Sequence, residues 1–298
     1  MRLGDGNDSD FIDRTGQSGG GPILGGGGGM LGLLIPLILS RFGIVGILIL
    51  ALGYCALSSL GGGGGILSGG GAPAQQQAGS GQSRLSPEMA RFLPAVLSST
   101  DAVWTDAFRQ SGAAYREPKL VAYTGGTQTG CGAGQAAMGP FYCPSDGNIY
   151  IDPTFFNELS RKFGAPGDFA AAYVIAHEVG HHIQNLEGTL DRAQSAQGRA
   201  GEAAGNQIQV GVELQADCYA GVWAANAKAP DGTRALEPGD AEEGLRAAEA
   251  IGDDTLQRQA QGTVVPESFT HGSSAQRMNA LRTGLESGNP ASCNFSRV

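Results

Sequence analysis

The sequence predicts an α+β protein that is mostly helical, with a small antiparallel sheet and one transmembrane helix ahead of the folded domain. Apolar residues recur at helical spacing in several segments of the C-terminal half. Two short runs of strand-forming residues, 141–143 and 148–152, flank a turn sequence at 144–147. A nearly continuous apolar run covers residues 42–60. These three observations define the expected class.

Composition sets the domain boundaries and excludes one class of partner. The chain has 298 residues, a formal net charge of −9 and 50 glycines, which concentrate in two linker-like stretches. No cluster of Lys and Arg could neutralise a row of phosphates, so nucleic acid is not an expected partner. We predict a flexible cytoplasmic tail (1–29), a membrane segment (30–60), a linker (61–84) and one folded domain (85–298). The oligomeric state stays open.

The apolar run 42–60 is long enough for one membrane span, because about 20 apolar residues cross a bilayer. Arg41 can extend its charge to the headgroups at the end of this run. Arg2, Arg14 and Arg41 all precede the span, and the next basic residue is Arg84. Positive charge favours the cytoplasmic side. We therefore expect a single-pass protein of a bacterial inner membrane, with the N-terminus cytoplasmic and the domain periplasmic or extracellular.

Two alternatives for the apolar region remain open at this stage. The segment Ala72-Pro73-Ala74 resembles a signal-peptide cleavage site, although the part ahead of the apolar run is far longer than a usual n-region. A lipoprotein anchor at Cys55 is disfavoured by the bulky Tyr54 before it. In the single-span interpretation, the shorter apolar run 30–39 lies in or near the membrane interface.

Four further cysteines agree with a location outside the cytoplasm. Cys131, Cys143, Cys218 and Cys293 form an even set, which predicts two disulfides in an oxidising compartment. Of the three possible connectivities we favour Cys131 with Cys143, around a glycine-rich loop, and Cys218 with Cys293, between a core helix and the C-terminal end. Free buried thiols are the alternative.

The expected elements of the domain follow in chain order. Ser86 and Pro87 have the residue types of an N-cap and a first helical position, so a helix begins there and a second one follows from Thr100. Residues 119–123 predict a strand and precede the hairpin at 141–152. Later helices are predicted at 153–163, 168–186, 207–227, 241–251 and 273–285.

The run His177-Glu178-Val179-Gly180-His181 predicts a metal site. On a helix, His177 and His181 differ by only about 40° of rotation, so both rings can reach one ion. Glu178 can take a proton from a metal-bound water, whose pKa zinc lowers to about 7. The alternatives are a chance HExxH string or two core histidines. Three of the chain's four histidines lie in this stretch, which disfavours both, and His182 is assigned no role.

A third ligand decides the subclass of the site. The metzincin pattern would need Gly at position 184 and His at position 187, and the chain has Gln184 and Glu187 there. Downstream, Glu213 and Asp217 are four residues apart in a nearly all-apolar segment, where an acidic pair needs a strong partner. Glu213 can complete a His2Glu site and Asp217 can hold the far nitrogen of a ligand histidine, which we expect to be His177. A solvated helix face is the alternative, with Glu187 as the substitute ligand.

These segments together resemble a known family. The matching sequences are Gly139-Pro140-Phe141-Tyr142-Cys143-Pro144, Ile149-Tyr150-Ile151-Asp152, and the stretches 14–17, 177–184, 213–223 and 271–277. On these residues the chain resembles the bacterial putative neutral zinc metallopeptidase family, single-pass membrane proteins of gluzincin type. The likeness extends over nearly the whole chain.

The resemblance implies a zinc peptidase acting on peptides or proteins. It implies His177, His181 and Glu213 as the zinc ligands and Glu178 as the catalytic base. It also suggests that the strand at 148–152 lies near the cleft, where zincins pair an extended substrate with a sheet edge.

For the oxyanion of the tetrahedral intermediate the sequence offers His271, the only histidine outside the helix motif. Tyr219 and Tyr150 are rivals for that role, and His271 as an ordinary surface residue is a further alternative. A non-catalytic zinc-containing peptide-binding or scaffold protein of the cell envelope is the competing function.

Overall fold

The computed structural model describes residues 1–17 and 82–295, and within these ranges the protein is mostly helical with two small sheets. The predicted span at 42–60, the rest of the segment 30–60 and Cys55 lie outside the described residues, as does most of the predicted linker. No helix in the ranges 1–17 and 82–295 combines the length and the apolar character that crossing a membrane requires.

The main sheet is mixed, which differs from the antiparallel sheet predicted. Its strand order is β1-β2-β6-β5. β1 and β6 each pair with β2 in parallel, and β5 pairs with β6 as the predicted antiparallel hairpin. A separate β3-β4 hairpin was not predicted, because its glycine-rich strands lack the usual strand formers. The strands are β1 (Phe11–Asp13), β2 (Lys119–Ala122), β3 (Gly126–Thr129), β4 (Gly132–Gln135), β5 (Phe141–Cys143) and β6 (Asn148–Ile151).

The helices agree with the predicted ones, with three differences. Their bounds are α2 (Pro87–Gln110), α3 (Thr154–Arg161), α4 (Asp168–Leu186), α5 (Thr189–Gln197), α6 (Glu202–Asn226), α7 (Asp240–Ala250), α8 (Asp253–Gln261) and α9 (Ser274–Ser287). Ser86 caps α2 by accepting from the Met89 N–H. α2 continues past Thr100, where a second helix was expected, and the Thr100 hydroxyl donates to the Leu97 carbonyl and does not act as an N-cap. The short polar helices α5 and α8 were not predicted.

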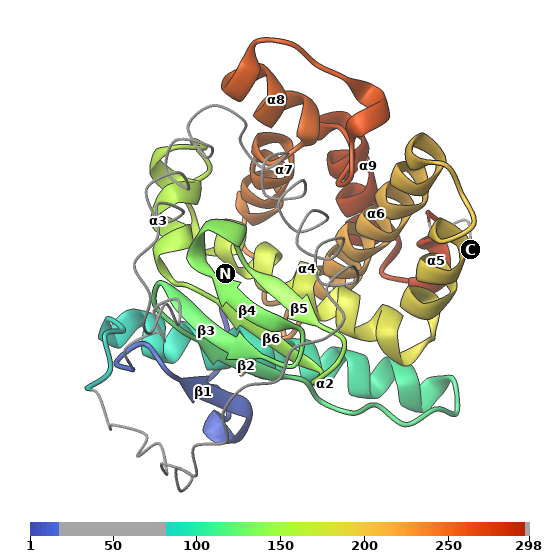
Figure 1. Ribbon diagram of the computed structural model, residues 1–298. Helices are drawn as coiled ribbons and strands as arrows, with labels where there is room; N and C mark the ends of the chain where they lie inside the picture. The colour runs from blue at the N-terminus through green and yellow to red at the C-terminus, as the bar shows by residue number, and fades with distance from the viewer. Residues whose placement is uncertain (18–81, 296–298) are drawn as a thin grey trace, which may run out of the picture. The chain divides into compact units, whose positions relative to one another are not determined.

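Helix α4 occupies the centre of the hydrophobic core. It contacts α2 and β5 on one side and α6 and α7 on the other (Figure 1). Fifteen of its nineteen residues are buried, so it is apolar nearly all round apart from the histidine motif. The helix begins after Gly167, whose φ of 131° is open to glycine, and Asp168 places a negative charge in its first turn. The motif is therefore held inside the domain.

Helices α6 and α9 pack so closely at Gly221 and Gly284 that no side chain fits at these two positions. A Cβ atom on Gly284 would meet the backbone of Cys218 and Val222, and one on Gly221 would meet that of Leu281. Two glycines facing each other thus let the two backbones approach. This contact sets where α9 places its side chains against α6.

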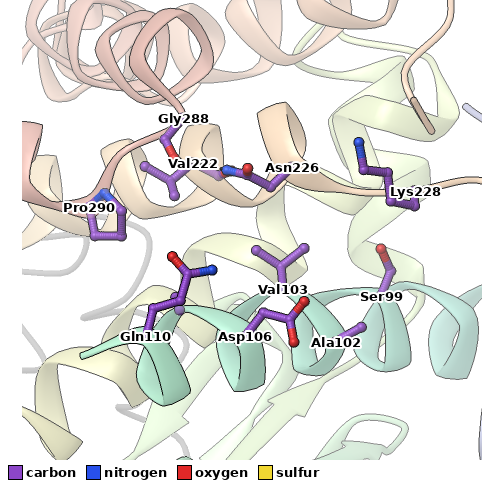
Figure 2. A pocket seen from close by; sticks show the side chains of 11 residues that line it. Ser99, Ala102, Val103, Asp106, Gln110, Val222, Asn226, Lys228, Gly288 and Pro290 are labelled. Carbon is purple, nitrogen blue, oxygen red and sulfur yellow. Dashed lines mark hydrogen bonds between the residues drawn. The ribbon is translucent and has the colours of Figure 1, made fainter. Parts of the chain in front are cut away.

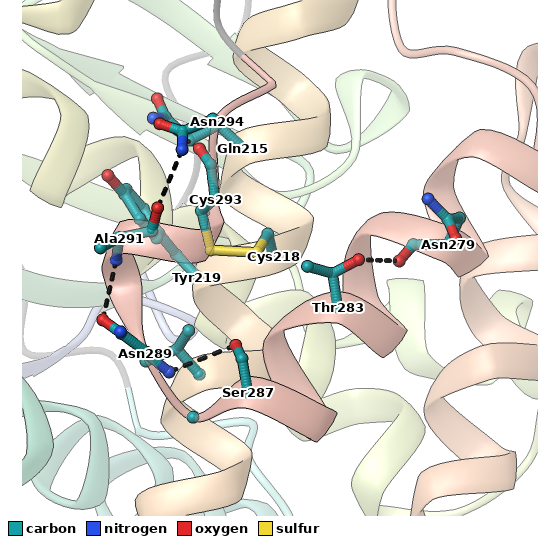
Figure 3. Close-up of a disulfide and its surroundings, with 12 residues drawn as sticks. Gln215, Cys218, Tyr219, Asn279, Thr283, Ser287, Asn289, Ala291, Cys293 and Asn294 are labelled. Atoms are coloured by element: carbon teal, nitrogen blue, oxygen red, sulfur yellow. Dashed lines mark hydrogen bonds between the residues drawn. A yellow bond between two sulfur atoms is a disulfide. The ribbon is translucent and has the colours of Figure 1, made fainter.

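Both favoured disulfides are present. Cys131, between β3 and β4, is bonded to Cys143 at the end of β5. Cys218 of α6 is bonded to Cys293 in the segment after α9, and the Gln215 side chain donates to the Cys293 carbonyl at 3.1 Å (Figure 3). The C-terminal segment is thereby fixed to the helix that carries Glu213 and Asp217.

The first seventeen residues fold onto the domain, in contrast to the flexible tail predicted over 1–29. Phe11 of β1 lies opposite Leu120 of β2, and the Arg14 N–H donates to the Ala122 carbonyl at 2.7 Å. The Met1 ammonium lies 2.7 Å from the Asp168 carboxylate at the start of α4. The N-terminal segment is therefore part of the same sheet and core as residues 82–295.

Candidate metal centre

The two histidines of the motif lie side by side on α4. His177 is 7% exposed, and the His181 ring lies 4.7 Å from the His177 ring between centroids. The i, i+4 spacing on a straight helix produces this arrangement. Both rings point toward α6, which carries the two carboxylates.

A close helix crossing brings the carboxylates to the histidines. Gly180 of the motif packs on Ala216 of α6, where a Cβ on Gly180 would lie 2.9 Å from the Ala216 Cα and backbone oxygen. Ala216 lies between Glu213 and Asp217 along α6. The glycine therefore permits the approach that places both acidic side chains against the histidine rings.

Three atoms that could bind a metal converge at this crossing. The Glu213 Oε2 atom lies 3.1 Å from His177 Nε2 and 3.5 Å from His181 Nε2. Two ligands about 2.05 Å from a tetrahedral zinc ion lie about 3.3 Å apart. All three ligand atoms lie within 4.8 Å of one another. The residues therefore fit zinc in both donor type and spacing.

The charges of the cluster are strongly coupled. Burial opposes ionisation of Glu213, but His181 above all, then hydrogen bonds from both histidines and the more distant charge of His271, hold the pKa of this carboxyl well below its usual range. Burial likewise opposes the charged form of His177, and the Asp217 carboxylate outweighs it and raises the pKa of His177 to about 10. In the metal-free protein His177 is therefore protonated at neutral pH.

Asp217 takes the position predicted for it. Its Oδ1 atom lies 2.7 Å from His177 Nδ1, and the carboxylate is fully buried. With the Nδ1 proton directed at Asp217, Nε2 is the nitrogen of His177 that faces Glu213, and it could bind a metal once its own proton is lost.

His181 has a partner that the sequence analysis did not identify. Its Nδ1 atom lies 2.9 Å from the Gln184 side-chain oxygen, and Gln184 donates in turn to the Val212 carbonyl at 2.7 Å. Gln184 is fully buried. The signal was its position three residues after His181, which places both side chains on one helix face. Gln184 thus orients His181 as Asp217 orients His177, with an amide in place of a carboxylate.

Glu213 is also oriented by Gln209, a residue to which the sequence alone assigned no role. Gln209, one helical turn earlier, donates to the Glu213 Oε1 atom at 2.9 Å. This bond occupies the oxygen that faces away from the histidines and leaves Oε2 toward them. The i, i+4 spacing of Gln209 and Glu213 is common on helices, so it indicates a functional pair only once Glu213 is known to be buried.

The structure does not bring Glu187 or His182 into the cluster. Glu187 accepts a hydrogen bond from the Tyr219 hydroxyl at 2.9 Å. His182 lies between the Arg116 carbonyl and the Tyr142 hydroxyl, at 2.6 and 3.1 Å from its two ring nitrogens. Burial, opposed by the Arg116 carbonyl bond, lowers the pKa of His182 to about 4 and keeps it neutral. It serves to join α4 to β5.

Glu178 and His271 lie on different elements beside the cluster. Glu178 is 7% exposed and follows His177 on α4. His271 belongs to the loop before α9, whose three N–H groups at 270–272 all donate to Asp253 at 2.7–3.0 Å. The His271 side chain is 53% exposed, and its Nδ1 atom lies 3.4 Å from Asp253 Oδ1. Nδ1 of His271 is thus the ring nitrogen that faces the loop, since the Thr270 hydroxyl also lies 3.1 Å from it.

The tyrosines considered as rivals of His271 are engaged elsewhere. The Tyr150 hydroxyl donates to Asp146 at 2.7 Å, and the Tyr219 hydroxyl is bound to Glu187. Burial first, and then Glu187, raises the pKa of Tyr219 far above its ordinary value. Both hydroxyls therefore already have a carboxylate partner.

A surface pocket of about 310 Å³ lies elsewhere, between α2 and the C-terminal end of α6 (Figure 2). Val103 and Asp106 of α2 line it, together with Val222 and Asn226 of α6 and Lys228. None of the residues that line this pocket belongs to the histidine–glutamate cluster. It is not part of the candidate metal centre.

Comparisons with known proteins agree with the chemistry of the cluster. The family model described as putative neutral zinc metallopeptidase matches residues 1–295. An uncharacterised Escherichia coli protein, YpfJ, is 45% identical over 298 residues, covering 99% of this chain and 98% of its own. An uncharacterised protein of Mycobacterium tuberculosis is 43% identical over 225 residues, which are 71% of this chain and 73% of that one. No solved structure matches the chain significantly.

The charge coupling predicts that zinc affinity rises with pH. Because His177 has a pKa of about 10, zinc must displace a proton from it at every pH below that value. The zinc dissociation constant should fall at least about tenfold per pH unit between pH 6 and 9, since His181, whose pKa Glu213 raises against the effect of burial, also has to lose its proton at the lower end of this range. Chelator competition, corrected for protonation of the chelator, measures it.

The control is Asp217→Asn, which removes the carboxylate that raises the pKa of His177. Its pH dependence should shift toward the ordinary range of histidine, near pH 6.5. A dissociation constant that does not vary with pH in the unaltered protein would contradict the assignment.

Proposed function

The chain belongs to the putative neutral zinc metallopeptidase family, and on that premise we propose that it hydrolyses peptide bonds at the cluster of His177, His181 and Glu213, with Glu178 as general base. The cofactor is Zn²⁺, as the family description implies. The observation that carries the proposal is the convergence of two imidazole nitrogens and one carboxylate oxygen at zinc-ligand spacing, next to a buried glutamate.

The residues of this chain have separate tasks in the proposed mechanism. His177, His181 and Glu213 would hold zinc, which when bound polarises the scissile carbonyl and makes water acidic enough to react near neutral pH. Glu178 accepts the proton that this water loses as it attacks the carbonyl carbon. Glu178 then delivers the proton to the departing amine nitrogen as the C–N bond breaks. The carboxylate ends as it began.

β5 is the strand to which we assign the substrate. The family resemblance suggests that the strand at 148–152 lies near the cleft, but β6 lies between β2 and β5 and has no free edge. β1 and β5 are the two edge strands of this sheet, and β5 is the one that packs against α4. Its Tyr142 hydroxyl contacts His182 and accepts from Asn185, both of α4. An extended peptide can pair with this edge beside the catalytic helix.

His271 is the side chain we propose for the oxyanion. The loop that carries it is bound by Asp253, and its charge lowers the pKa of Glu213, although less than His181 does. An imidazole held in this way can donate to the oxygen that becomes negative during attack. Tyr219 and Tyr150 are less suitable because carboxylates already bind their hydroxyls.

Replacing Glu178 by Gln separates a peptidase from a zinc-containing scaffold. We expect Glu178→Gln to keep its zinc and to lower kcat by about 10²- to 10⁴-fold, because the amide cannot accept the proton. Cleavage of unstructured fluorogenic peptides and metal analysis of the same sample measure both. His271→Gln should also retain zinc and lower kcat by about 10²- to 10³-fold, through loss of one donor.

The exposed glutamate Glu202 provides a matched control, and Glu202→Gln should behave as the unaltered protein. Wild-type activity in Glu178→Gln, or no chelator-sensitive cleavage by the unaltered protein, would favour the scaffold function.

The ligand set is tested by two isosteric variants. Glu213→Gln removes a charged ligand, so we expect zinc affinity to fall by more than about 100-fold. Glu187→Gln should leave zinc affinity near that of the unaltered protein, because Glu187 faces Tyr219. Chelator competition measures both. The reverse order of effects would assign the third ligand to Glu187.

We propose further that the domain works outside the cytoplasm, at the membrane. Two disulfides support an oxidising compartment, and the apolar segment predicted at 30–60 supports attachment. Because β1 pairs with β2, residues 1–17 share the compartment of the domain. The chain would then enter and leave the membrane on the same side.

Cysteine labelling tests this arrangement in the full chain. In a Cys55→Ser background, Ser9→Cys and Ala113→Cys each add one exposed thiol, on the N-terminal segment and on the domain. In spheroplasts a membrane-impermeant maleimide should label both. If Ser9→Cys is labelled only after permeabilisation, the N-terminus is cytoplasmic. If neither variant is labelled in spheroplasts, the domain is cytoplasmic as well.

A further inference from the structure

Arg277 of α9 is a buried charge whose partners lie at the metal centre. It is 4% exposed, and its Nε and Nη2 atoms donate to the two oxygens of Asp217, each at 2.9 Å. We propose that Arg277 is a positioning residue for the zinc centre, acting through Asp217 on His177. The inference rests on the proposed zinc ligands and assigns a role to a helix outside the histidine motif.

The paired hydrogen bonds from Nε and Nη2 of Arg277, a two-point fork, determine which way the Asp217 carboxylate faces. A guanidinium bound to both carboxylate oxygens fixes the plane of that group, which a single-point donor cannot do. Asp217 Oδ1 then also accepts from the Tyr173 hydroxyl at 2.6 Å and contacts His177 Nδ1 at 2.7 Å. The oxygen that orients His177 is thus the one shared with Arg277 and Tyr173.

Arg277 also compensates the charge that the centre buries. Asp217 is fully buried, and a carboxylate in that position requires a countercharge and hydrogen bonds. Without Arg277, two of the hydrogen bonds to Asp217 and its permanent countercharge would be lost together. The carboxylate would be free to turn toward other donors, and the His177 ring would lose its fixed direction.

The surrounding fold holds Arg277 in place. Ser273 and Gln276 form a capping box at the start of α9, and Arg277 Nη1 donates to the Ile251 carbonyl at 3.3 Å. Farther along, Gly284 of α9 faces Gly221 of α6. Arg277 Nη2 is also 3.2 Å from the Tyr173 hydroxyl of α4. One guanidinium therefore contacts the two helices that carry the zinc ligands.

The test measures zinc binding rather than catalysis. In the full-length protein, Arg277→Met should raise the zinc dissociation constant by about 10- to 100-fold, as loss of a group that orients a ligand does. Arg277→Lys keeps the charge but not the fork, and should have an intermediate effect. Arg282→Met is the matched control, because Arg282 is an exposed arginine of the same helix. Chelator competition provides the constants.

A double-variant cycle shows whether Arg277 acts through Asp217. In an Asp217→Asn background, Arg277→Met should change the dissociation constant by much less than it does alone. Equal factors in both backgrounds would overturn the proposal. So would wild-type zinc affinity in Arg277→Lys and Arg277→Met.

Cobalt spectroscopy separates positioning from a purely structural role. The visible absorption of the Co²⁺-substituted Arg277→Lys protein should differ from that of the unaltered protein, because the ligand geometry changes, whereas Arg282→Met should not differ. If Arg277→Met fails to fold, Arg277→Lys decides alone, and an unchanged spectrum and zinc affinity overturn the proposal. Loss of peptidase activity in Glu178→Gln is independent of these results, so failure of this inference and failure of the proposed function are distinguishable.

Discussion

The Asp217 carboxylate is the constraint on which the arrangement of the domain depends. It is fully buried, and an unpaired charge there would be strongly unfavourable. The structure satisfies it with Tyr173 and His177 from α4 and with Arg277 from α9, while Asp217 itself belongs to α6. Any shift of one of these three helices along another would break a charged hydrogen bond. The contacts that set the geometry of the metal centre therefore also set how the core helices pack.

Small residues make this solution sterically possible. Gly180 allows α4 to cross α6 at Ala216, and Gly221 with Gly284 allows α6 to approach α9. The first contact places the histidines against Glu213, and the second places Arg277 against Asp217. The Cys218–Cys293 disulfide then fixes the C-terminal segment to the same stretch of α6. The polar contacts fix how the helices are aligned along one another, and the glycines allow the short distance between helix backbones that these contacts require.

The N-terminal segment adds a constraint from the opposite end of the chain. β1 extends the sheet beside β2, and the Met1 ammonium meets Asp168 in the first turn of α4. The domain is thus assembled from both sides of the region 18–81, whatever role that region has. Pairing of β1 with β2 fixes Phe11 within one strand spacing of Leu120.

The sequence by itself determined the features that depend on local spacing. The bounds of α4, the placing of His177 and His181 on one face, and the hairpin of β5 and β6 all follow from periods of 3.6 and 2 residues and from turn residues. Only the tertiary structure decided which carboxylate meets the histidines, that Gln184 and Arg277 support them, and that β1 joins the sheet in parallel. Those contacts join residues far apart in the chain, and no local period encodes how two distant segments are aligned.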